Sequence, residues 1–453
     1  MKNLSKEAIS KLKYLATQKI TYLPASLHRR RVNHVTFIGI TGSAGKTTTK
    51  DLTAAILANF GSCQQTLGSY NTLKSVASRV WHTNKAHRYC VVELGVTGPG
   101  TLDLSSRLLK PDIAVITVIG RDHYSAFKSM EAIVAEKEKV VLALSPKGTA
   151  VLNIDDPLVR SIGERCNRRI IWFGEGTGAT LRLIEARSRW PEPLTLRFEY
   201  QNKIYEIHTQ LHGTHMAIPV LASLGVALAA DLPLEKAIQV VEQFQPPDGR
   251  MQVITDNDGV VFIRDDFKAP QWSLNASLKF LQEARADRKI AIIGTIADST
   301  GDAAKRYKRY CRDFRNCADI VVFIGHNAHR ALRARQNESD STIQGFSSIR
   351  HAANYLQTEL RKGDLVFLKG SYKADHLNRL IINRVCPIQC WKDRCNVDIL
   401  CDKCPKLYRF LPDIPFADKI SMQTGTTVPA FVWLKNIGAR FFFSLKSILQ
   451  NLG

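Results

Sequence analysis

The sequence HVTFIGITGSAGKTTT, residues 34–49, joins a short apolar run to a glycine-containing loop. The first seven residues are rich in β-branched side chains, which is typical of a buried strand. After the loop, apolar side chains recur at helical spacing as far as Phe60. The segment therefore predicts a strand, a tight loop and a helix that begins near Thr47.

The loop contains the residues that a phosphate site needs. Glycine lets backbone N–H groups approach phosphate oxygens closely, and the N-terminus of the following helix adds the positive end of its dipole. Lys46 can reach the terminal phosphates of a nucleotide, and the Thr47 hydroxyl can bind Mg²⁺. The residues expected to contact the nucleotide are Thr41, Gly42, Ser43, Ala44, Gly45, Lys46, Thr47 and Thr48.

The composition excludes several classes of protein. The chain has 453 residues, 45% of them hydrophobic, and 63 Lys and Arg against 41 Asp and Glu give a net charge of +22. An ordinary apolar content argues against a disordered chain, and a length beyond about 250–300 residues favours two or three domains. No apolar run is long enough for a membrane span, and the charged N-terminus does not resemble a signal peptide. We expect a cytoplasmic protein with reduced thiols.

Strand-like and helical patterns alternate along most of the chain, which favours an α/β fold with a largely parallel sheet covered by helices. A β-rich stretch at 181–207 interrupts this alternation, and Pro246-Pro247-Asp248-Gly249 is a linker pattern after which it resumes. We divide the chain into a basic helical lead (1–33), a central domain (34–245), a second domain (246–385) and a Cys-rich, basic tail (386–453).

The loop departs from the common phosphate-loop pattern at one position, since Ile40 stands where that pattern has glycine. The variant TGxxGKTTT is that of the Mur ligase superfamily, and the chain resembles Mur-type amide ligases over residues 35–385. Further similar stretches, the last of them like the branch that adds D-alanyl-D-alanine, are VELG (92–95), GRDH (120–123), SMEAIVAEK (129–137), VLNIDDP (151–157), Gly249-Arg250, DDFKAP (265–270) and GDLVFLKGS (363–371). The resemblance implies a central P-loop ATPase-type domain followed by a Rossmann-like C-terminal domain.

The resemblance also implies a reaction. Enzymes of this family make peptide bonds with ATP: a carboxylate takes the γ-phosphoryl group, and an amine then displaces phosphate from the acyl phosphate. Hard cations prefer oxygen ligands, so Thr47 and Glu93 would bind Mg²⁺, while a ligand such as His123 would also suit Mn²⁺. The resemblance assigns catalytic roles to Lys46, His123, Lys137, Arg250 and Asp265, and places Asn71 beside the nucleotide.

Two of these assignments have a rival close by in the sequence. Lys137 is implied to carry a carbamate, but it lies in a run of alternating Glu and Lys, which is usually an exposed helix face, and Lys139 is the alternative. Asp265 and Asp266 are adjacent, and we favour Asp265.

Three departures from the family concern substrate choice. Wall-synthesis members carry a UDP-recognition domain before the phosphate loop, whereas about 34 residues precede it here, so we expect an acceptor that no such domain binds. Met216 and Pro219 replace two asparagines of a family segment that contacts the nucleotide base. Lys268 stands where some relatives have histidine or asparagine.

The tail contains five of the ten cysteines within 19 residues. Such spacing leaves three states open: a structural Zn²⁺ site, an iron–sulfur cluster or free thiols. The candidate ligands are Cys386, Cys390, Cys395, Cys401 and Cys404. The apolar, basic end at 431–449 favours either a helix docked on the body or contact with an anionic membrane surface.

We therefore predict an ADP-forming, ATP-dependent ligase that joins an amino acid or short peptide to a carboxylate acceptor. The alternative is a non-catalytic, ATP-binding scaffold or regulator. We expect no nucleic acid as partner, because helicase-like motifs and base-stacking aromatic clusters are missing. The lead contributes +7 and the residues from Cys386 onward +4 of the net charge, so an anionic membrane surface or carrier is the partner that these flanking segments suggest.

Overall fold

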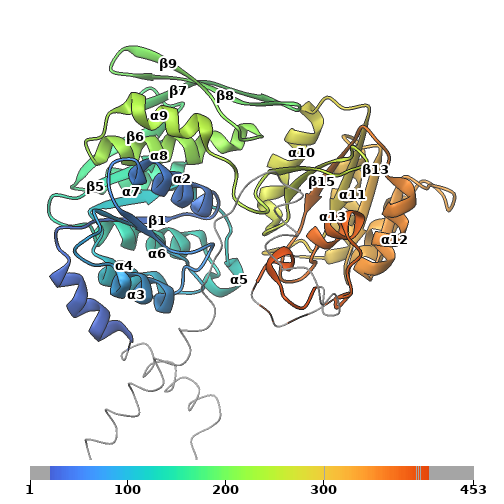
Figure 1. Ribbon diagram of the computed structural model, residues 1–453, viewed down its shortest axis with the longest axis horizontal. Helices are drawn as coiled ribbons and strands as arrows, with labels where there is room; N and C mark the ends of the chain where they lie inside the picture. Colours follow the sequence, from blue (N-terminus) through green and yellow to red (C-terminus); the bar gives the residue numbers. More distant parts are fainter. Residues whose placement is uncertain (1–20, 300, 394, 396, 398, 408–453) are drawn as a thin grey trace, which may run out of the picture.

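The computed structural model describes residues 21–299, 301–393, 395, 397 and 399–407. Figure 1 shows two α/β bodies side by side, the first coloured blue to green and the second yellow to red. The α/β class that the sequence predicts is confirmed. The boundaries of 34–245 and 246–385 stay predictions, although each range contains one sheet.

The first body is built on a nine-stranded sheet in the order β2-β3-β1-β4-β5-β6-β7-β8-β9. Its strands are parallel from β2 to β7, and β8 and β9 are antiparallel. The strands are β1 (Thr36–Thr41), β2 (Cys63–Gln65), β3 (Tyr89–Glu93), β4 (Ile113–Ile116), β5 (Thr149–Asn153), β6 (Arg169–Gly174), β7 (Leu181–Arg189), β8 (Glu192–Tyr200) and β9 (Lys203–His208). The β-rich stretch at 181–207 thus extends the main sheet.

Helices cover both faces of this sheet because its central strands are apolar on both sides. Phe37 packs into one hydrophobic cluster, whereas Ile38 and Ile40 pack into the other. The helices α2 (Lys46–Ala58), α8 (Ala217–Ala229) and α9 (Leu234–Gln243) lie on one face. The opposite face carries α3 (Leu73–His82), α4 (Thr101–Leu109), α6 (Met130–Leu142) and α7 (Pro157–Glu164), and the short α5 (Tyr124–Phe127) precedes α6.

The second body contains a six-stranded sheet in the order β10-β11-β15-β12-β13-β14. Only the edge strand β10 is antiparallel to its neighbour. The strands are β10 (Gln252–Thr255), β11 (Val261–Asp265), β12 (Arg288–Ile293), β13 (Ile320–Ile324), β14 (Ile343–Phe346) and β15 (Asp364–Lys369). The helices are α10 (Leu274–Glu283), α11 (Ala303–Arg315), α12 (Ile349–Glu359) and α13 (Asn378–Val385).

Short 3-10 helices complete the described elements: η1 (Thr214–Met216) precedes α8 in the first body, and η2 (Gln271–Ser273), η3 (Ala328–Ala334) and η4 (Cys401–Lys403) follow later in the chain. The β7–β9 end of the first sheet reaches toward α10 (Figure 1), where Arg285 N donates to Trp190 O at 3.0 Å. This contact joins the two bodies at a point remote from the linker.

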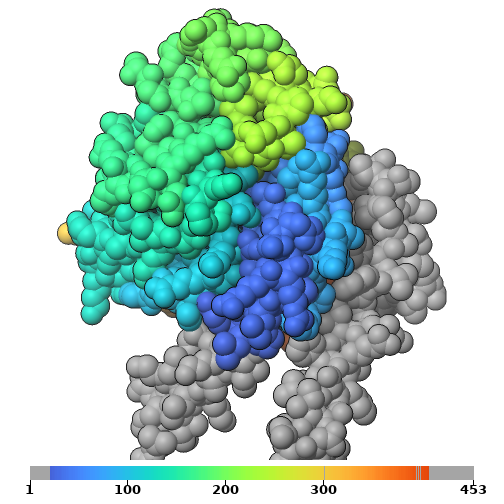
Figure 2. Space-filling view, turned by 90° about the vertical axis from the view of Figure 1, so that its left-hand side faces the viewer, coloured from blue at the N-terminus to red at the C-terminus, as the bar shows by residue number. Residues whose placement is uncertain are grey.

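The described part of the lead is helical over 21–31 and lies on the first body, on the face shown in dark blue in Figure 2. Arg29 fixes it there, because its Nε donates to Leu109 O at 2.7 Å. Residues 1–20 and the apolar end at 431–449 lie outside the described residues, and so do the predictions made for them. In the part of the chain that is described, no helix has the length and apolar character of a membrane span.

Candidate functional site

The phosphate loop connects β1 to α2 as the sequence predicts. Gly42 (φ 145°) and Gly45 (φ 77°) adopt backbone conformations that favour glycine. A Cβ at Gly42 would lie 1.9 Å from Thr117 Oγ1, and that hydroxyl donates to Ala44 O at 2.6 Å. Thr117, the residue that follows β4, therefore bonds the backbone of the loop and leaves no space for a side chain at position 42.

Lys46 opens α2 and folds back over this loop, where its Nζ donates to Gly42 O at 2.8 Å. Ser43 links the loop to the end of β4, since its Oγ accepts from Gly120 N at 2.9 Å. The loop thus presents an ammonium group beside the N-terminus of a helix, which is the arrangement that attracts a phosphate.

Polar oxygens gather beside the loop at the end of β3. Thr47 Oγ1 donates to Glu93 Oε2 at 2.7 Å, and Asn71 Nδ2 donates to Glu93 Oε1 at 2.8 Å. Ser69 Oγ lies 2.8 Å from Thr47 Oγ1. Three elements that are distant in the sequence therefore bring two hydroxyls and a carboxylate to one point.

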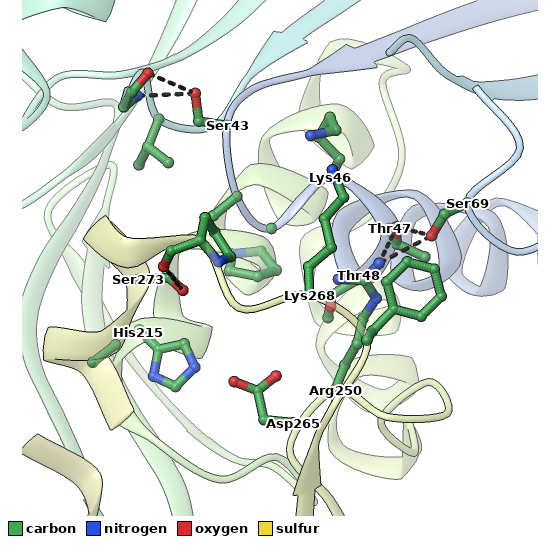
Figure 3. Close-up of a pocket in the computed structure, with 18 of the residues that line it drawn as sticks. Ser43, Lys46, Thr47, Thr48, Ser69, His215, Arg250, Asp265, Lys268 and Ser273 are labelled. Atoms are coloured by element: carbon green, nitrogen blue, oxygen red, sulfur yellow. Dashed lines mark hydrogen bonds between the residues drawn. The ribbon is translucent and has the colours of Figure 1, made fainter. Parts of the chain in front are cut away.

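The second body contributes an arginine to the same point (Figure 3). Arg250 Nη2 donates to Thr47 Oγ1 and to Ser69 Oγ, both at 2.9 Å. Its guanidinium lies 4.3 Å from the centre of the Phe267 ring, a distance at which cation and ring attract each other. This arginine therefore connects the two bodies at the phosphate loop.

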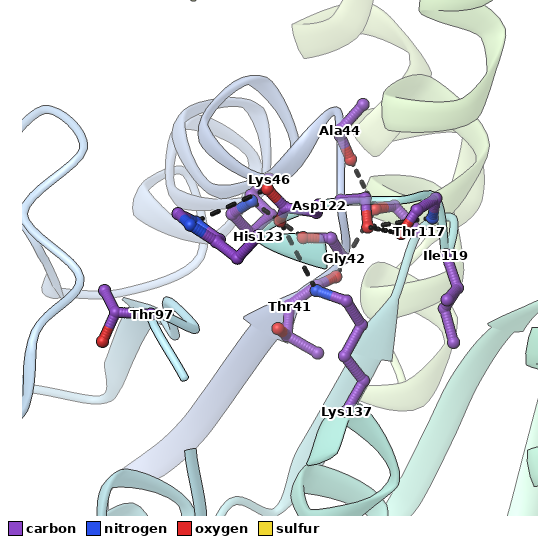
Figure 4. A network of polar contacts seen from close by, with 12 residues as sticks. Thr41, Gly42, Ala44, Lys46, Thr97, Thr117, Ile119, Asp122, His123 and Lys137 are labelled. Atoms are coloured by element: carbon purple, nitrogen blue, oxygen red, sulfur yellow. Dashed lines mark hydrogen bonds and ion pairs between the residues drawn. The ribbon is translucent and has the colours of Figure 1, made fainter. Parts of the chain in front are cut away.

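A carboxylate near Lys46 links two predicted residues (Figure 4). Asp122 Oδ1 is 3.5 Å from His123 Nε2, and its Oδ2 is 3.8 Å from Lys137 Nζ. Burial raises the pKa of Asp122, but the nearby Lys46 and Lys137 ammonium groups outweigh burial and hold it below its ordinary value. Asp122 is thus a negative charge among cations.

Burial also favours the neutral forms of two neighbours of Asp122, Lys137 and His123. Lys137 is only 1% exposed, and burial together with the nearby Lys46 lowers the pKa of its ammonium to about 7. Burial also lowers the pKa of His123, against the attraction of Asp122. Lys139, the rival of Lys137, pairs with Glu136 at 2.7 Å, and its side chain is 30% exposed. Lys137 is therefore the lysine in a chemically unusual environment.

These groups surround a cavity of about 610 Å³ whose walls come from both bodies. The second body supplies Asp265, which pairs with Lys369, and Lys268, which points toward the phosphate loop (Figure 3). His215 lies in the wall as a neutral ring, because burial lowers its pKa to about 4. Met216 and Pro219, which replace the two asparagines, also line the cavity.

Most of the predicted site residues meet at this cavity. Those in its wall are Ser43, Ala44, Gly45, Lys46, Thr47, Thr48, Asn71, Glu93, Arg250 and Asp265. Thr41 and Gly42, at the start of the loop, are buried. His123 and Lys137 both lie against Asp122, outside the residues that line the cavity. Prediction missed Asp122, which lies in the GRDH stretch, and Ser69, which lies two residues before Asn71.

The cysteines form a partial cluster away from this cavity. Cys401 Sγ is 3.4 Å from His376 Nδ1, and Cys395 Sγ is 3.8 Å from the opposite ring nitrogen. Within the described ranges, no three His, Cys, Asp or Glu side chains are grouped so that they could hold a metal ion. The zinc site and the Mg²⁺ ligands named from the sequence therefore stay predictions.

The chain is similar in sequence to known ligases. A UDP-N-acetylmuramoyl-tripeptide–D-alanyl-D-alanine ligase of Mycobacterium leprae is 27% identical over 372 residues, which cover 75% of this chain and 72% of that protein. The ligase of the same name from Treponema pallidum is 26% identical over 352 residues, covering 77% and 74%.

Solved structures agree on the fold. MurF of Acinetobacter baumannii superimposes with a TM-score of 0.73 at 24% identity, covering 82% of this chain and 80% of that one. MurF of Thermotoga maritima in complex with ADP gives a TM-score of 0.68 at 23% identity, covering 80% and 81%. Residues 40–227 match the Mur ligase middle domain, and residues 249–372 match the Mur ligase glutamate ligase domain. With these two domains in succession over more than two thirds of its length, the chain belongs to the Mur ligase superfamily of ATP-dependent, amide-forming ligases.

Proposed function

We propose that this chain activates a carboxylate with ATP and joins it to the amine of an amino acid or short peptide at the cavity between the two bodies. The observation that carries the proposal is the contact of Arg250 with Thr47 and Ser69. An arginine from the second body at the end of the phosphate loop can stabilise the charge that develops on a transferred phosphoryl group.

The residues of the loop fit the triphosphate of ATP. Glycine at position 42 lets the backbone turn without a side chain, and the Lys46 ammonium already bonds an oxygen of the loop. A phosphate can take the place of that carbonyl as partner of Lys46. The N-terminus of α2 adds its dipole, so the triphosphate is held by backbone and charge together.

The oxygen cluster at the end of β3 fits Mg²⁺. Thr47 and Ser69 offer hydroxyls and Glu93 offers a carboxylate, which are ligands that a hard cation prefers. When bound, the ion would neutralise charge on the phosphates. Asn71 holds Glu93 in place through its amide. His123 lies against Asp122 and not in this oxygen cluster, so it would be a ligand of a second metal ion, where Mn²⁺ would also fit.

Lys137 fits a role that needs a neutral amine. A pKa of about 7 leaves about three quarters of the side chains uncharged at pH 7.5, and only the neutral amine reacts with carbon dioxide to give a carbamate. The product would turn a buried cation into an oxygen ligand beside Asp122. Wild-type activity that rises with added bicarbonate, together with the loss of activity in Lys137→Met, would support this role.

The substrates are proposed from chemistry and from the relatives. Lys268 places positive charge in the second-body wall, which favours an anionic acceptor. The relatives are named for a UDP-N-acetylmuramoyl tripeptide and for D-alanyl-D-alanine, so these are the first pair to test. Single amino acids and other dipeptides form the rest of the panel.

The experiment measures ADP release in the presence of each acceptor and amine. We expect release that requires both substrates and that disappears in Lys46→Ala and in Glu93→Ala. ATP binding without any amine-stimulated turnover across the panel would instead favour the scaffold. A structural Zn²⁺ among the tail cysteines is a separate proposal, which metal analysis of wild type and Cys401→Ser tests.

A further inference from the structure

The turn at Cys401–Cys404 lies against the linker that opens the second body. The Lys403 ammonium pairs with the Asp248 carboxylate, and Asp402 Oδ2 lies 3.5 Å from Arg264 Nη1. Figure 1 shows this segment in red on the flank of the second body that is nearer to the first. A turn more than 130 residues further along the chain therefore contacts the residue two positions before Arg250.

Arg264 is the centre of these contacts and is buried, with its side chain 3% exposed. Its Nε donates to Asp266 Oδ1 and its Nη1 to Gln252 Oε1, both at 3.2 Å. The same Gln252 oxygen accepts from Gly249 N at 3.2 Å. A displacement of Arg264 would therefore displace Gln252 and, through it, the backbone of the linker at Gly249.

The linker has little freedom to absorb such a shift. Gly249 has a φ of 68°, and a Cβ there would lie 2.8 Å from Asp266 Oδ1. The next residue, Arg250, leaves this turn to reach Thr47 across the gap between the bodies. Its guanidinium rests on Phe267, which directly follows Asp266. Both supports of Arg250 thus depend on the Arg264–Asp266 pair.

The turn is itself anchored to the second body. Arg379 Nε donates to Cys401 Sγ at 3.2 Å, and its Nη1 donates to Lys392 O at 2.8 Å. The Arg379 side chain is almost completely buried. The turn therefore has a fixed base from which its two charged residues reach Arg264 and Asp248.

We propose that the Asp402–Lys403 turn is a positioning element of the ligase site, which orients the linker so that Arg250 meets the phosphate loop. Asp402 is the central positioning residue, because its carboxylate completes the charge around a buried guanidinium whose other carboxylate partner is Asp266. This role rests on the proposed function of Arg250. It assigns part of the Cys-rich segment to the reaction without any metal.

The test is a double-mutant cycle on the full chain. Asp402→Asn should lower kcat about tenfold, since a small displacement of a catalytic group costs one to two orders of magnitude. In an Arg250→Met background, Asp402→Asn should have no further effect, because its influence passes through Arg250. Losses that multiply in the double variant would overturn the proposal.

Matched variants separate positioning from folding. Asp393→Asn makes the same chemical change in the same segment, but Asp393 accepts from Ile349 N at the start of α12 and is expected to leave kcat unchanged. Asp402→Glu should restore part of the activity. If Asp402→Asn does not fold, Lys403→Met replaces it in the cycle, because the Lys403 side chain is 59% exposed. The expected loss of kcat is then smaller.

The outcomes distinguish this inference from the proposed function. Wild-type kcat in Arg250→Met would overturn the role of Arg250 and the positioning role with it. A large loss in Arg250→Met together with wild-type kcat in both Asp402→Asn and Lys403→Met would overturn the positioning role alone.

Discussion

Replacing Lys137 by methionine should stabilise the folded chain while abolishing its activity. The Lys137 amine is buried, has no hydrogen-bond partner in the described part of the chain, and is 3.8 Å from the nearest carboxylate oxygen, that of Asp122. Methionine has a similar volume and length and carries no charge. The substitution therefore removes an amine whose charged form is destabilised by burial.

The size of the effect follows from the pKa of Lys137. The fall from 10.5 to about 7 corresponds to a penalty of about 5 kcal/mol below pH 7, since each tenfold change is about 1.4 kcal/mol. The unfolded chain binds more protons between pH 7 and 10.5, so stability rises with pH in this window. From pH 7 to pH 9, Lys137 alone should add about 2 kcal/mol to the free energy of unfolding.

Urea denaturation at pH 7 and pH 9, in buffers free of carbon dioxide, measures this difference. Lys137→Met should lose the gain of about 2 kcal/mol, because other groups titrate similarly in both proteins. Lys139→Met is the control, since Lys139 lies on the same helix, is partly exposed and pairs with Glu136. Its free energy of unfolding should change with pH as in wild type.

Two results would refute this reasoning. The same pH dependence in Lys137→Met and wild type would mean that the Lys137 amine is not held neutral by burial. Ligase activity close to wild type in Lys137→Met would mean that the amine has no part in the reaction, whatever its pKa.

Three further predictions concern other parts of the site. Gly42→Ala should cost about 1–3 kcal/mol of stability and abolish ATP binding, as measured by denaturation and calorimetry, because the new Cβ would overlap Thr117 Oγ1. Glu93→Gln should weaken activation by Mg²⁺ at least about tenfold in a titration of ADP release, since the neutral amide replaces the carboxylate beside Thr47. Cys401→Ser should leave the zinc content of the purified chain lower if the tail holds a structural ion, and unchanged zinc content would contradict that site.

Local patterns in the sequence predict most of the strands and helices of the first body. The loop at 41–48 is a contiguous motif whose glycines, lysine and threonine must lie together because they are neighbours in the chain. The strand and helix on either side follow from β-branched content and helical spacing. The β-rich stretch at 181–207 was predicted as strands, but its membership in the main sheet depends on the pairing of β6 with β7, which no local pattern specifies.

Side-chain environments needed the tertiary structure. In the sequence, Lys137 and Lys139 occupy similar places in one charged run, and only packing of α6 against the sheet buries the first and leaves the second 30% exposed. The sequence pattern indicates His123 and not the adjacent Asp122, although both His123 and Lys137 face the Asp122 carboxylate.

The sequence by itself determined that this chain binds a nucleotide phosphate and belongs among the Mur ligases, because those properties depend on contiguous residue types. The resemblance also named Arg250, but only the tertiary structure decided that Arg250 contacts Thr47, 203 residues earlier, and that the turn at Asp402, still further along the chain, lies beside the linker. Contacts over such separations depend on how two sheets and a linker pack together, and the spacing of residues along the chain does not record that geometry.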